Sequence, residues 1–374
     1  MRLAVDTTSL IGARTGIGTV TEALLRRLPR PGVDVTAFAV THRGARELAD
    51  SLPPGIDASR RRMAARPLRA TWARSSWPPI EWWTGAIDVV WGPNFVVPPA
   101  RRATRVVTVH DLTCVHMPEL TTADTRQVPR LLRRAVHDGA HVHAVSHAVA
   151  HDLTDTLGIP ASSITVVHNG APSAMSAEER SSLAARGRSL ASSDSYVLAL
   201  GTIEPRKDLP SLVRAFDLLA GARPDLRLVL AGPDGWGSDA VTEAIAASRH
   251  GRSILRTGWV SDDDRAALLA GASVLAYPSL LEGFGLPPLE AMAAGTPVVA
   301  TTVGALPEVL GDAAQWCAPS DPDALAEALA VVLDDPDRRR QLVELGDARL
   351  PLFSWDRSAD ALVELFGRLV ASAA

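Results

Sequence analysis

Two glutamates, Glu282 and Glu290, stand eight positions apart in a segment that joins a glycine loop to an expected helix start. The prolines at 287–288 favour a first helical turn, because a proline there loses no intrahelical hydrogen bond. Gly283 and Gly285 let the backbone approach a ligand, and amides at a helix start favour an anion such as a diphosphate. Carboxylates beside a phosphate instead accept hydrogen bonds from hydroxyls. A ligand with central phosphates and polyols at both ends, such as a nucleotide-sugar, fits this pattern.

The residues on either side of this segment predict the frame that holds it. Residues 272–277 and 297–300 are expected to be buried strands, so the segment becomes a strand–loop–helix–strand unit. In such a unit the ligand lies off the carboxyl end of the first strand. Strands and helices alternate in the same way along the rest of the chain, which predicts an α/β protein with parallel sheets covered by helices on both faces.

A second motif, Gly201-Thr-Ile-Glu-Pro-Arg-Lys-Asp208, follows an expected strand at 196–200 and precedes an expected helix at 209–220. Arg206 and Lys207 therefore stand near a helix start, where cations are unfavourable unless an anion lies between. Lys207 is the single lysine in a chain with 37 arginines. Because the composition favours arginine so strongly, a lysine here is poorly explained as a solvent-exposed residue without a specific function. An ammonium group and a guanidinium fork both suit a diphosphate.

These two segments resemble the retaining family-4 glycosyltransferases, which have the GT-B fold and a Glu-x7-Glu signature that Glu282 and Glu290 match. The resemblance covers nearly the whole chain and is strongest between 201 and 300. It implies two Rossmann-like parallel-sheet domains facing a central cleft. It also implies a bacterial hexosyltransferase of glycan, cell-envelope or glycolipid synthesis, with a nucleoside-diphosphate sugar as donor and a saccharide or lipid-linked acceptor. Mannose is the first expectation for the sugar, and no cofactor or metal is expected.

The resemblance implies a role for each matching donor-site residue. Glu282 would contact hydroxyls of the donor sugar, and Glu290 would contact the nucleotide ribose. Arg206 and Lys207 would bind the diphosphate and stabilise the charge that builds on it as the sugar–phosphate bond breaks. The family pattern reads Arg-Lys-Asn here, and the departure, Asp208, is expected to be a helix cap. The amides that would hold sugar and phosphate belong to Gly283, Phe284, Gly285 and Leu286.

The first half of the chain offers further candidates. Val106-Val-Thr-Val-His-Asp-Leu112 is typical of a buried strand that delivers His110 and Asp111 to its carboxyl end. The matching family histidine contacts the transferred sugar across the cleft, and His110 is not expected to be an obligatory general base. A structural histidine is the alternative. Gly16 and Gly18 belong to a loop whose order does not fit a dinucleotide fingerprint, and the resemblance places them near the donor phosphates.

A turn at 257–261 resembles the family's base-binding turn, in which backbone groups of Val260 would meet the nucleobase. The three aspartates that follow, at 262–264, could suggest a metal site. They suit the start and first turn of a helix better, so no metal is expected there.

An unusual segment, residues 59–83, holds six arginines and four tryptophans. Arginine next to tryptophan suits an anionic, amphipathic partner such as a membrane surface or a lipid-linked saccharide. The alternative is a solvated basic loop whose tryptophans pack in the core. The candidate membrane or acceptor residues are Arg60, Arg61, Arg62, Trp72 and Trp77.

The composition bears on three further questions, which are nucleic-acid binding, the state of the cysteines and membrane insertion. The net charge of −4 hides an asymmetry, since residues 1–170 carry 20 arginines against 14 acids, or +6, and residues 171–374 carry −10. An acidic protein without a recognised binding motif is not expected to bind nucleic acid. Two distant cysteines, Cys114 and Cys317, favour reduced thiols in the cytoplasm. No apolar stretch is long enough to cross a membrane, so any membrane contact would be peripheral, at the inner face of the plasma membrane.

The chain length predicts two domains. An acceptor-side domain is expected over 1–170, a Ser- and Ala-rich linker over 171–194, and a nucleotide-sugar-binding domain over 195–352. Residues 353–374 are expected to form a helix that, by the resemblance, returns to the first domain.

Two other functions are compatible with the same fold. One is a catalytically silent partner subunit, and the other is a nucleotide-sugar epimerase. The intact residues Arg206, Lys207 and Glu282 argue against a silent partner.

Overall fold

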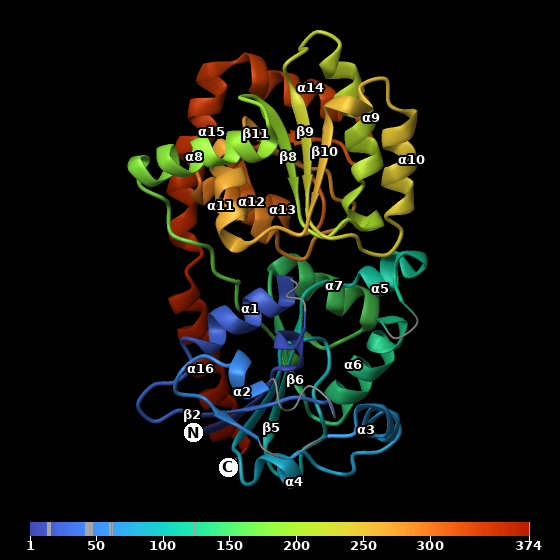
Figure 1. The fold of residues 1–374 in the computed structure, drawn as a ribbon. Helices are drawn as coiled ribbons and strands as arrows, with labels where there is room; N and C mark the ends of the chain where they lie inside the picture. The colour runs from blue at the N-terminus through green and yellow to red at the C-terminus, as the bar shows by residue number, and fades with distance from the viewer. Residues whose placement is uncertain (13–15, 42–47, 60, 62, 123–124, 374) are drawn as a thin grey trace. The chain divides into compact units, whose positions relative to one another are not determined.

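The structure is a computed structural model that describes residues 1–12, 16–41, 48–59, 61, 63–122 and 125–373 (Figure 1). The chain divides into two compact units. The first comprises Met1–Gly170 together with Trp355–Ala374, and the second comprises Ala171–Ser354. Among the described residues, no helix combines the length and the apolar character that crossing a membrane requires.

The first unit contains a seven-stranded parallel sheet in the order β3-β2-β1-β4-β5-β6-β7. Its strands are rich in β-branched residues, as expected of strands that helices cover on both faces. The strands are β1 Arg2–Asp6, β2 Asp34–Phe38, β3 Asp57–Ala58, β4 Val89–Gly92, β5 Thr104–Val109, β6 His141–Ala144 and β7 Ile164–Val166. The helices are α1 Gly16–Leu25, α2 Leu48–Ser51, α3 Ala65–Trp72, α4 Glu81–Thr84, α5 Thr113–His116, α6 Val128–His137, α7 His147–Leu157 and α16 Trp355–Ala373.

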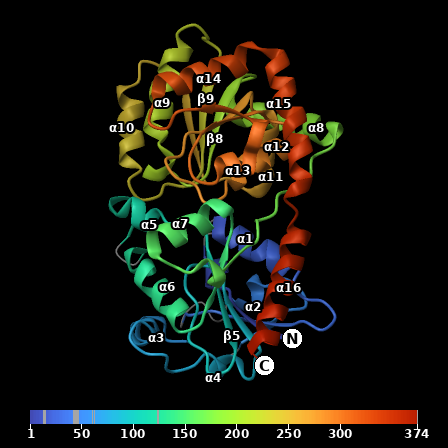
Figure 2. The ribbon, with the colours of Figure 1, turned by 180° about the vertical axis from the view of Figure 1, so that it is seen from behind.

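The helix α16 packs on the first unit, against α1 and β5 (Figure 2). The Phe366 ring is fully buried, and its centroid lies 5.9 Å from that of Trp91. Arg27 Nε pairs with Asp356 Oδ1 at 2.7 Å, but the Asp356 side chain is largely exposed. Because exposed ion pairs contribute little, apolar burial supplies most of the free energy that holds α16 in place.

The second unit contains a six-stranded parallel sheet in the order β10-β9-β8-β11-β12-β13. The strands are β8 Tyr196–Leu200, β9 Arg227–Ala231, β10 Ile254–Gly258, β11 Val274–Tyr277, β12 Val298–Thr301 and β13 Ala314–Cys317. The helices are α8 Ala177–Ala191, α9 Leu209–Ala220, α10 Asp239–Ala247, α11 Asp262–Gly271, α12 Leu286–Ala293, α13 Leu306–Leu310, α14 Pro322–Asp334 and α15 Pro336–Arg349.

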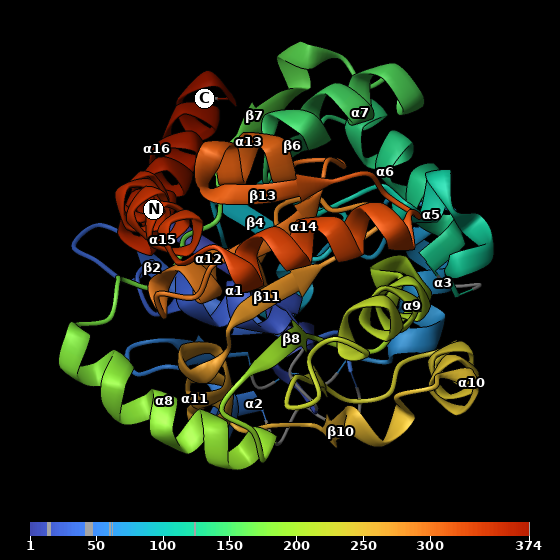
Figure 3. The ribbon, with the colours of Figure 1, turned by 90° about the horizontal axis from the view of Figure 1, so that it is seen from above.

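Alternate side chains of β8 serve the two faces of this sheet. Val197 and Ala199 join the core that includes α9 and α14. Tyr196 serves the other face, where its hydroxyl donates to the Leu268 carbonyl of α11 at 2.6 Å. Figure 3 shows α9, α10 and α14 on one side of the sheet, and α8, α11 and α12 on the other.

Residues 171–194, expected to be a linker, instead contain the helix α8 and belong to the second unit. Ser176 and Glu179 form a capping box that satisfies amides at the helix start. Gly187 lets α8 lie against α11, because a Cβ at this position would stand 2.0 Å from the Ala267 carbonyl oxygen. The small residues that suggested a flexible segment therefore allow close helix packing.

Candidate functional site

The strand order of the second unit reverses between β8 and β11, which pair side by side. In open parallel sheets, ligands bind off the carboxyl ends of the strands at such a reversal. The Arg-Lys motif at 201–208 follows β8, and the glutamate motif at 278–290 follows β11. The fold therefore delivers both motifs to the same place at one edge of one sheet.

Side chains of the two motifs form one cluster of charges. Arg206 Nη1 lies 2.6 Å from Glu282 Oε1, and Lys207 Nζ lies 3.8 Å from the same oxygen. The loops also meet through the backbone, where the Leu280 amide donates to the Arg206 carbonyl at 2.8 Å. Arg206 also donates from Nη2 to Glu204 at 2.7 Å, so its guanidinium ties two carboxylates together.

One oxygen of the Glu282 carboxylate collects these contacts. The Tyr277 hydroxyl donates to Oε1 at 2.7 Å, and the Ser279 hydroxyl donates to it at 2.9 Å. The other oxygen, Oε2, takes part in none of these bonds, so it can accept a hydrogen bond from a ligand hydroxyl. Tyr277 and Ser279 therefore orient the carboxylate, a role that the sequence analysis did not assign to them.

The cluster is buried, with 7% of Glu282 and 8% of Lys207 exposed. Burial acts to raise the pKa of the Glu282 carboxyl, but the charges of Arg206 and Lys207 prevail and hold it below its usual value. Burial lowers the pKa of the Lys207 ammonium, and the Glu282 charge opposes that change. Burial and the Glu282 charge also raise the pKa of the Tyr277 hydroxyl. Glu282 therefore stays ionised at neutral pH, while Tyr277 keeps the proton that it donates.

Gly201 makes room for Lys207. Its φ is +125°, a conformation that other residues rarely adopt, and a Cβ would stand 3.0 Å from Lys207 Cε. The Lys207 ammonium in turn lies 4.7 Å from the centre of the Tyr277 ring. A small cavity beside it, at the carboxyl ends of β8, β9 and β11, is lined by residues that include Leu200, Ala231, Pro278 and Ser279.

Glu290 lies in α12 and contacts a residue from α11. Its Oε2 accepts a hydrogen bond from Arg265 Nη2. Burial raises the pKa of the Glu290 carboxyl, and the Arg265 charge opposes that rise. The Glu-x7-Glu spacing predicted Glu290, whereas no sequence pattern predicted Arg265.

A glycine in a left-handed conformation precedes α12. Gly285, the N-cap residue, has a φ of +100° and comes just before the first helical residue, Leu286. The prolines at 287–288 carry no N–H, so Leu286 supplies an amide in the first turn. Gly283 precedes Phe284, whose buried ring meets Phe353 at right angles with centroids 5.6 Å apart.

The expected base-binding turn connects β10 to α11. Val260 is half-buried there, next to Ser261, whose hydroxyl accepts from the Asp264 amide at 3.1 Å. Residues 262–264 form the first turn of α11, which confirms the interpretation of these aspartates as a helix start.

In the first unit, His110 and Asp111 follow β5 at its carboxyl end. His110 Nε2 lies 2.7 Å from the Pro93 carbonyl oxygen, so Nε2 must carry the proton and Nδ1 is the acceptor of a neutral ring. Burial lowers the pKa of this imidazole, which favours the neutral form. Asp111 accepts a hydrogen bond at Oδ1 from the Thr113 amide at 2.9 Å, which stabilises the turn into α5.

The other candidates of the first unit are placed only in part. Gly16 and Gly18 lie at the start of α1, where Gly18 is buried. Residues 13–15, in the loop before Gly16, lie outside the described residues. Among the three candidate arginines at 60–62, Arg60 and Arg62 also lie outside the described residues, whereas Arg61 is described and exposed.

The tryptophans of the segment 59–83 divide into two kinds. Trp77 and Trp82 are 59% and 50% exposed, and their ring centroids lie 5.0 Å apart in an edge-to-face arrangement. Trp72 is half-buried, donates from Nε1 to the Pro78 carbonyl at 2.9 Å, and packs edge-on against Trp83. The core-packing alternative therefore does not hold for Trp77. Trp82 is an exposed tryptophan that the sequence analysis did not name as a candidate.

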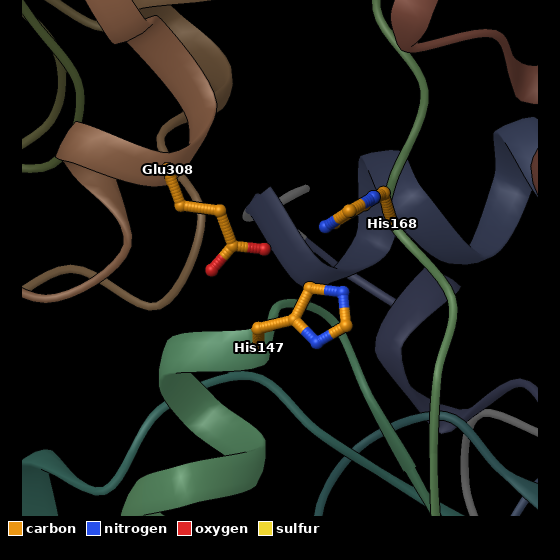
Figure 4. Close-up of side chains that lie close together, drawn as sticks. All are labelled: His147, His168 and Glu308. Carbon is orange, nitrogen blue, oxygen red and sulfur yellow. The ribbon is translucent and has the colours of Figure 1, made fainter.

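Figure 4 shows two histidines of the first unit, His147 at the start of α7 and His168 after β7. Their ring centroids lie 5.6 Å apart, with the planes at 71°. Glu308, which the figure also labels, belongs to α13 of the second unit. Two imidazoles alone do not complete the ligand set of a zinc site.

Comparisons with known proteins extend these observations. A model described as "Glycosyltransferase Family 4" matches residues 14–174, and one described as "Glycosyl transferases group 1" matches residues 184–349. O-antigen chain mannosyltransferase B of Escherichia coli is 31% identical over 286 residues, which cover 74% of this chain and 73% of that protein. MMP alpha-(1->4)-mannosyltransferase of Mycolicibacterium hassiacum is 33% identical over 263 residues, 68% of this chain but only 58% of that protein.

Solved structures share the fold. Sucrose-phosphate synthase from Thermosynechococcus elongatus superposes with a TM-score of 0.77 at 18% identity, and the match covers 100% of both chains. Anabaena HepE, solved in complex with UDP and glucose, superposes with a TM-score of 0.76 at 19% identity, over 98% of this chain and 99% of that one. The expected GT-B fold with two parallel-sheet domains is therefore confirmed.

Proposed function

The chain belongs to glycosyltransferase family 4, and from this premise we propose that it transfers a hexose from a nucleoside-diphosphate sugar to a saccharide or lipid-linked acceptor. Mannose is the first choice, because the E. coli and M. hassiacum relatives are named mannosyltransferases. The observation that carries the proposal is the meeting of Arg206, Lys207 and Glu282 beside β8 and β11. Cations suit the diphosphate of such a donor, and a carboxylate suits the hydroxyls of its sugar.

In this proposal the residues act on three parts of the donor, which are the sugar, the diphosphate and the ribose. Glu282 Oε2 accepts a hydrogen bond from a sugar hydroxyl, and Glu290 accepts from the ribose. Negative charge grows on the diphosphate as the bond to the anomeric carbon breaks, so Lys207 and Arg206 stabilise the transition state more than the ground state. His110 contacts the sugar through Nδ1, the ring nitrogen that can accept a hydrogen bond.

Retention of the anomeric configuration and independence of metal are parts of the same proposal. The acceptor oxygen forms its bond to the anomeric carbon on the face that the diphosphate leaves, and a leaving phosphate oxygen takes the acceptor's proton. Arg206 and Lys207 supply the positive charge that a divalent ion supplies in other phosphate chemistry. NMR of the product anomer, with and without EDTA, tests both parts. An inverted anomer, or activity that EDTA abolishes, would contradict them.

A donor panel tests the transfer itself. GDP-, UDP-, ADP- and dTDP-sugars are incubated with the protein and candidate acceptors, and mass spectrometry follows hydrolysis and transfer. Glu282→Gln should lose turnover, whereas Arg223→Gln, which breaks an exposed pair with Asp334, should not. Absence of binding and turnover with every donor would refute the proposal, and binding without turnover would favour a silent partner subunit.

We further propose that the first unit contacts an anionic membrane surface through an aromatic surface, defined as Trp77 and Trp82 with the exposed arginines around them. These arginines are Arg61, Arg74, Arg101 and Arg102. Glu81, the acid next to Trp82 in sequence, accepts hydrogen bonds at Oε1 from the Arg101 and Arg102 amides at 2.8 and 3.0 Å, and these contacts partly offset its charge. Exposed indoles with arginines match the interface of an anionic bilayer.

The position of the aromatic surface favours a large partner. The hydrogen bonds of Glu81 place the aromatic surface beside residues 101–102, which come just before the first residue of β5. His110 lies at the other end of β5, just after its last residue. A strand of six residues spans about 20 Å, so one hexose cannot meet both His110 and Trp82.

Sedimentation with vesicles tests the contact. Trp77→Ser/Trp82→Ser, and separately replacement of 60–62 by Ser, should weaken binding to phosphatidylglycerol vesicles. Trp236→Ser, at an exposed tryptophan of the second unit, should not weaken it. Phosphatidylcholine vesicles should bind little in every case. Unchanged sedimentation of the double variant would end the membrane proposal and leave the transfer proposal intact.

A further inference from the structure

Arg265 occupies a position for which the sequence motifs gave no role. It lies in the first half of α11, which packs against α12, the helix of Glu290 (Figure 1). Its Nη2 donates to Glu290 Oε2, and the two side chains are 29% and 13% exposed. One oxygen of the Glu290 carboxylate is therefore held by the protein itself.

The guanidinium of Arg265 is not fully satisfied by the described residues. Its Nε is buried and has no hydrogen-bond partner among them. A buried donor without a partner is costly, and native proteins retain such groups rarely. Nε is therefore a donor of Arg265 that its contact with Glu290 leaves unsatisfied.

Charged groups reach Glu290 from two neighbouring elements. Helix α11 contributes Arg265 and Asp262, and the loop after β8 contributes Lys207. Burial raises the pKa of the Glu290 carboxyl, and Arg265 is the strongest of the groups that oppose this rise. A buried carboxylate without such a partner tends to take up a proton, and a protonated carboxyl is a poorer acceptor.

We propose that Arg265 is a positioning residue for nucleotide binding, which holds Glu290 by Oε2 and directs Oε1 to the ribose hydroxyls of the donor. The proposal rests on the proposed function, because the ribose arrives with a nucleoside diphosphate. A carboxylate oxygen has two lone-pair directions, so one fixed Oε1 can accept hydrogen bonds from both hydroxyls of a ribose. Arg265 thus acts on the nucleotide through Glu290 rather than through the phosphates.

Isothermal titration with UDP, GDP and ADP tests this role. The ribonucleotide that binds the wild-type protein most tightly is compared with its 2′,3′-dideoxy counterpart. Arg265→Gln should weaken the ribonucleotide about tenfold, the effect of losing one charge-assisted hydrogen bond, and should leave the dideoxy affinity unchanged. Arg186→Gln is the matched control, since Arg186 pairs with Asp264, the neighbour of Arg265 in α11.

The pH dependence separates positioning from a merely structural role. Ribonucleotide binding requires ionised Glu290, so affinity falls as the pH drops through the pKa of that carboxyl. Without Arg265 that pKa rises, so Arg265→Gln should lose affinity at a higher pH than the wild type. Arg265→Lys, which keeps the charge, should restore the wild-type midpoint. Arg265→Gln/Glu290→Gln should bind no more weakly than Glu290→Gln alone.

The outcomes distinguish this proposal from the one on which it rests. A wild-type protein that binds none of the nucleotides refutes the proposed function. A wild-type preference for the ribonucleotide that survives in Arg265→Gln refutes only the positioning role. An equal loss for ribonucleotide and dideoxynucleotide, or an unmoved pH midpoint in Arg265→Gln, also refutes it. If Arg265→Gln does not fold, Glu290→Gln decides: a preference for the ribonucleotide that survives in this variant refutes the proposal, because Arg265 would then have no ribose-binding carboxylate to position.

Discussion

Replacing Lys207 by Met should remove most of the turnover and leave the free energy of unfolding nearly unchanged. Methionine has a similar unbranched shape, so it fills the space over the Tyr277 ring while it removes the charge. The substitution removes the positive charge of Lys207 Nζ, which lies 3.8 Å from Glu282 Oε1. Both residues are buried.

Two opposing contributions set the expected stability. At an effective dielectric constant of about 20, unit charges 3.8 Å apart attract by about 4 kcal/mol. Removing an ammonium group from water costs several kcal/mol, and the variant no longer bears that cost. Arg206 still neutralises Glu282 from 2.6 Å. Because the two contributions nearly cancel, we expect a change within about 1 kcal/mol.

The effect on catalysis should be much larger. Loss of one preorganised group at a developing charge lowers kcat by about 10²–10³. Since that charge grows towards the transition state, kcat should fall more than KM rises. Mass-spectrometric kinetics and calorimetry measure the two effects, with Arg223→Met as the surface control. Near-normal turnover together with a large fall in melting temperature would refute the reasoning, because Lys207 would then be structural.

Three further outcomes follow from described contacts. Tyr277→Phe removes a hydroxyl that donates to Glu282, so the free energy of unfolding should fall by about 1.5–3 kcal/mol in a urea titration, and an unmoved midpoint would contradict that bond. Gly187→Ala puts a Cβ 2.0 Å from a backbone carbonyl oxygen and should lower the melting temperature, whereas Gly221→Ala meets nothing within 4 Å and should not. Burial raises the pKa of both cysteine thiols to about 11, so iodoacetamide at about pH 8 should label the unfolded protein but not the native one, as mass spectrometry would count.

The cluster of Arg206, Lys207 and Glu282 could be predicted because each of these residues lies close in sequence to the end of a strand. Arg206 and Lys207 follow a strand within a few residues, and Glu282 follows the neighbouring strand in the same way. The sequence therefore carries both the residue types and the edge of the sheet at which they emerge. Once β8 and β11 are known to be adjacent, contacts between the side chains of the two loops that follow them are expected.

Partners that depend on a particular turn or on helix packing could not be predicted. Ser279 meets Glu282 only because the chain turns back after β11. Arg265 meets Glu290 only because α11 packs on α12, and neither helix carries a pattern that reveals its neighbour. The helix α8 was missed because its serines and alanines are common both in linkers and in closely packed helices.

The discontinuous first unit has a consequence for how the protein is made. Helix α16 follows residues 171–354 in the chain, so a growing polypeptide can fold its second unit while the first still lacks a helix. During that interval the apolar side chains that will face Phe366, Trp91 among them, have no cover from it. A fragment that stops before Trp355 would keep this patch open to water and would become a substrate for chaperones, proteases or aggregation.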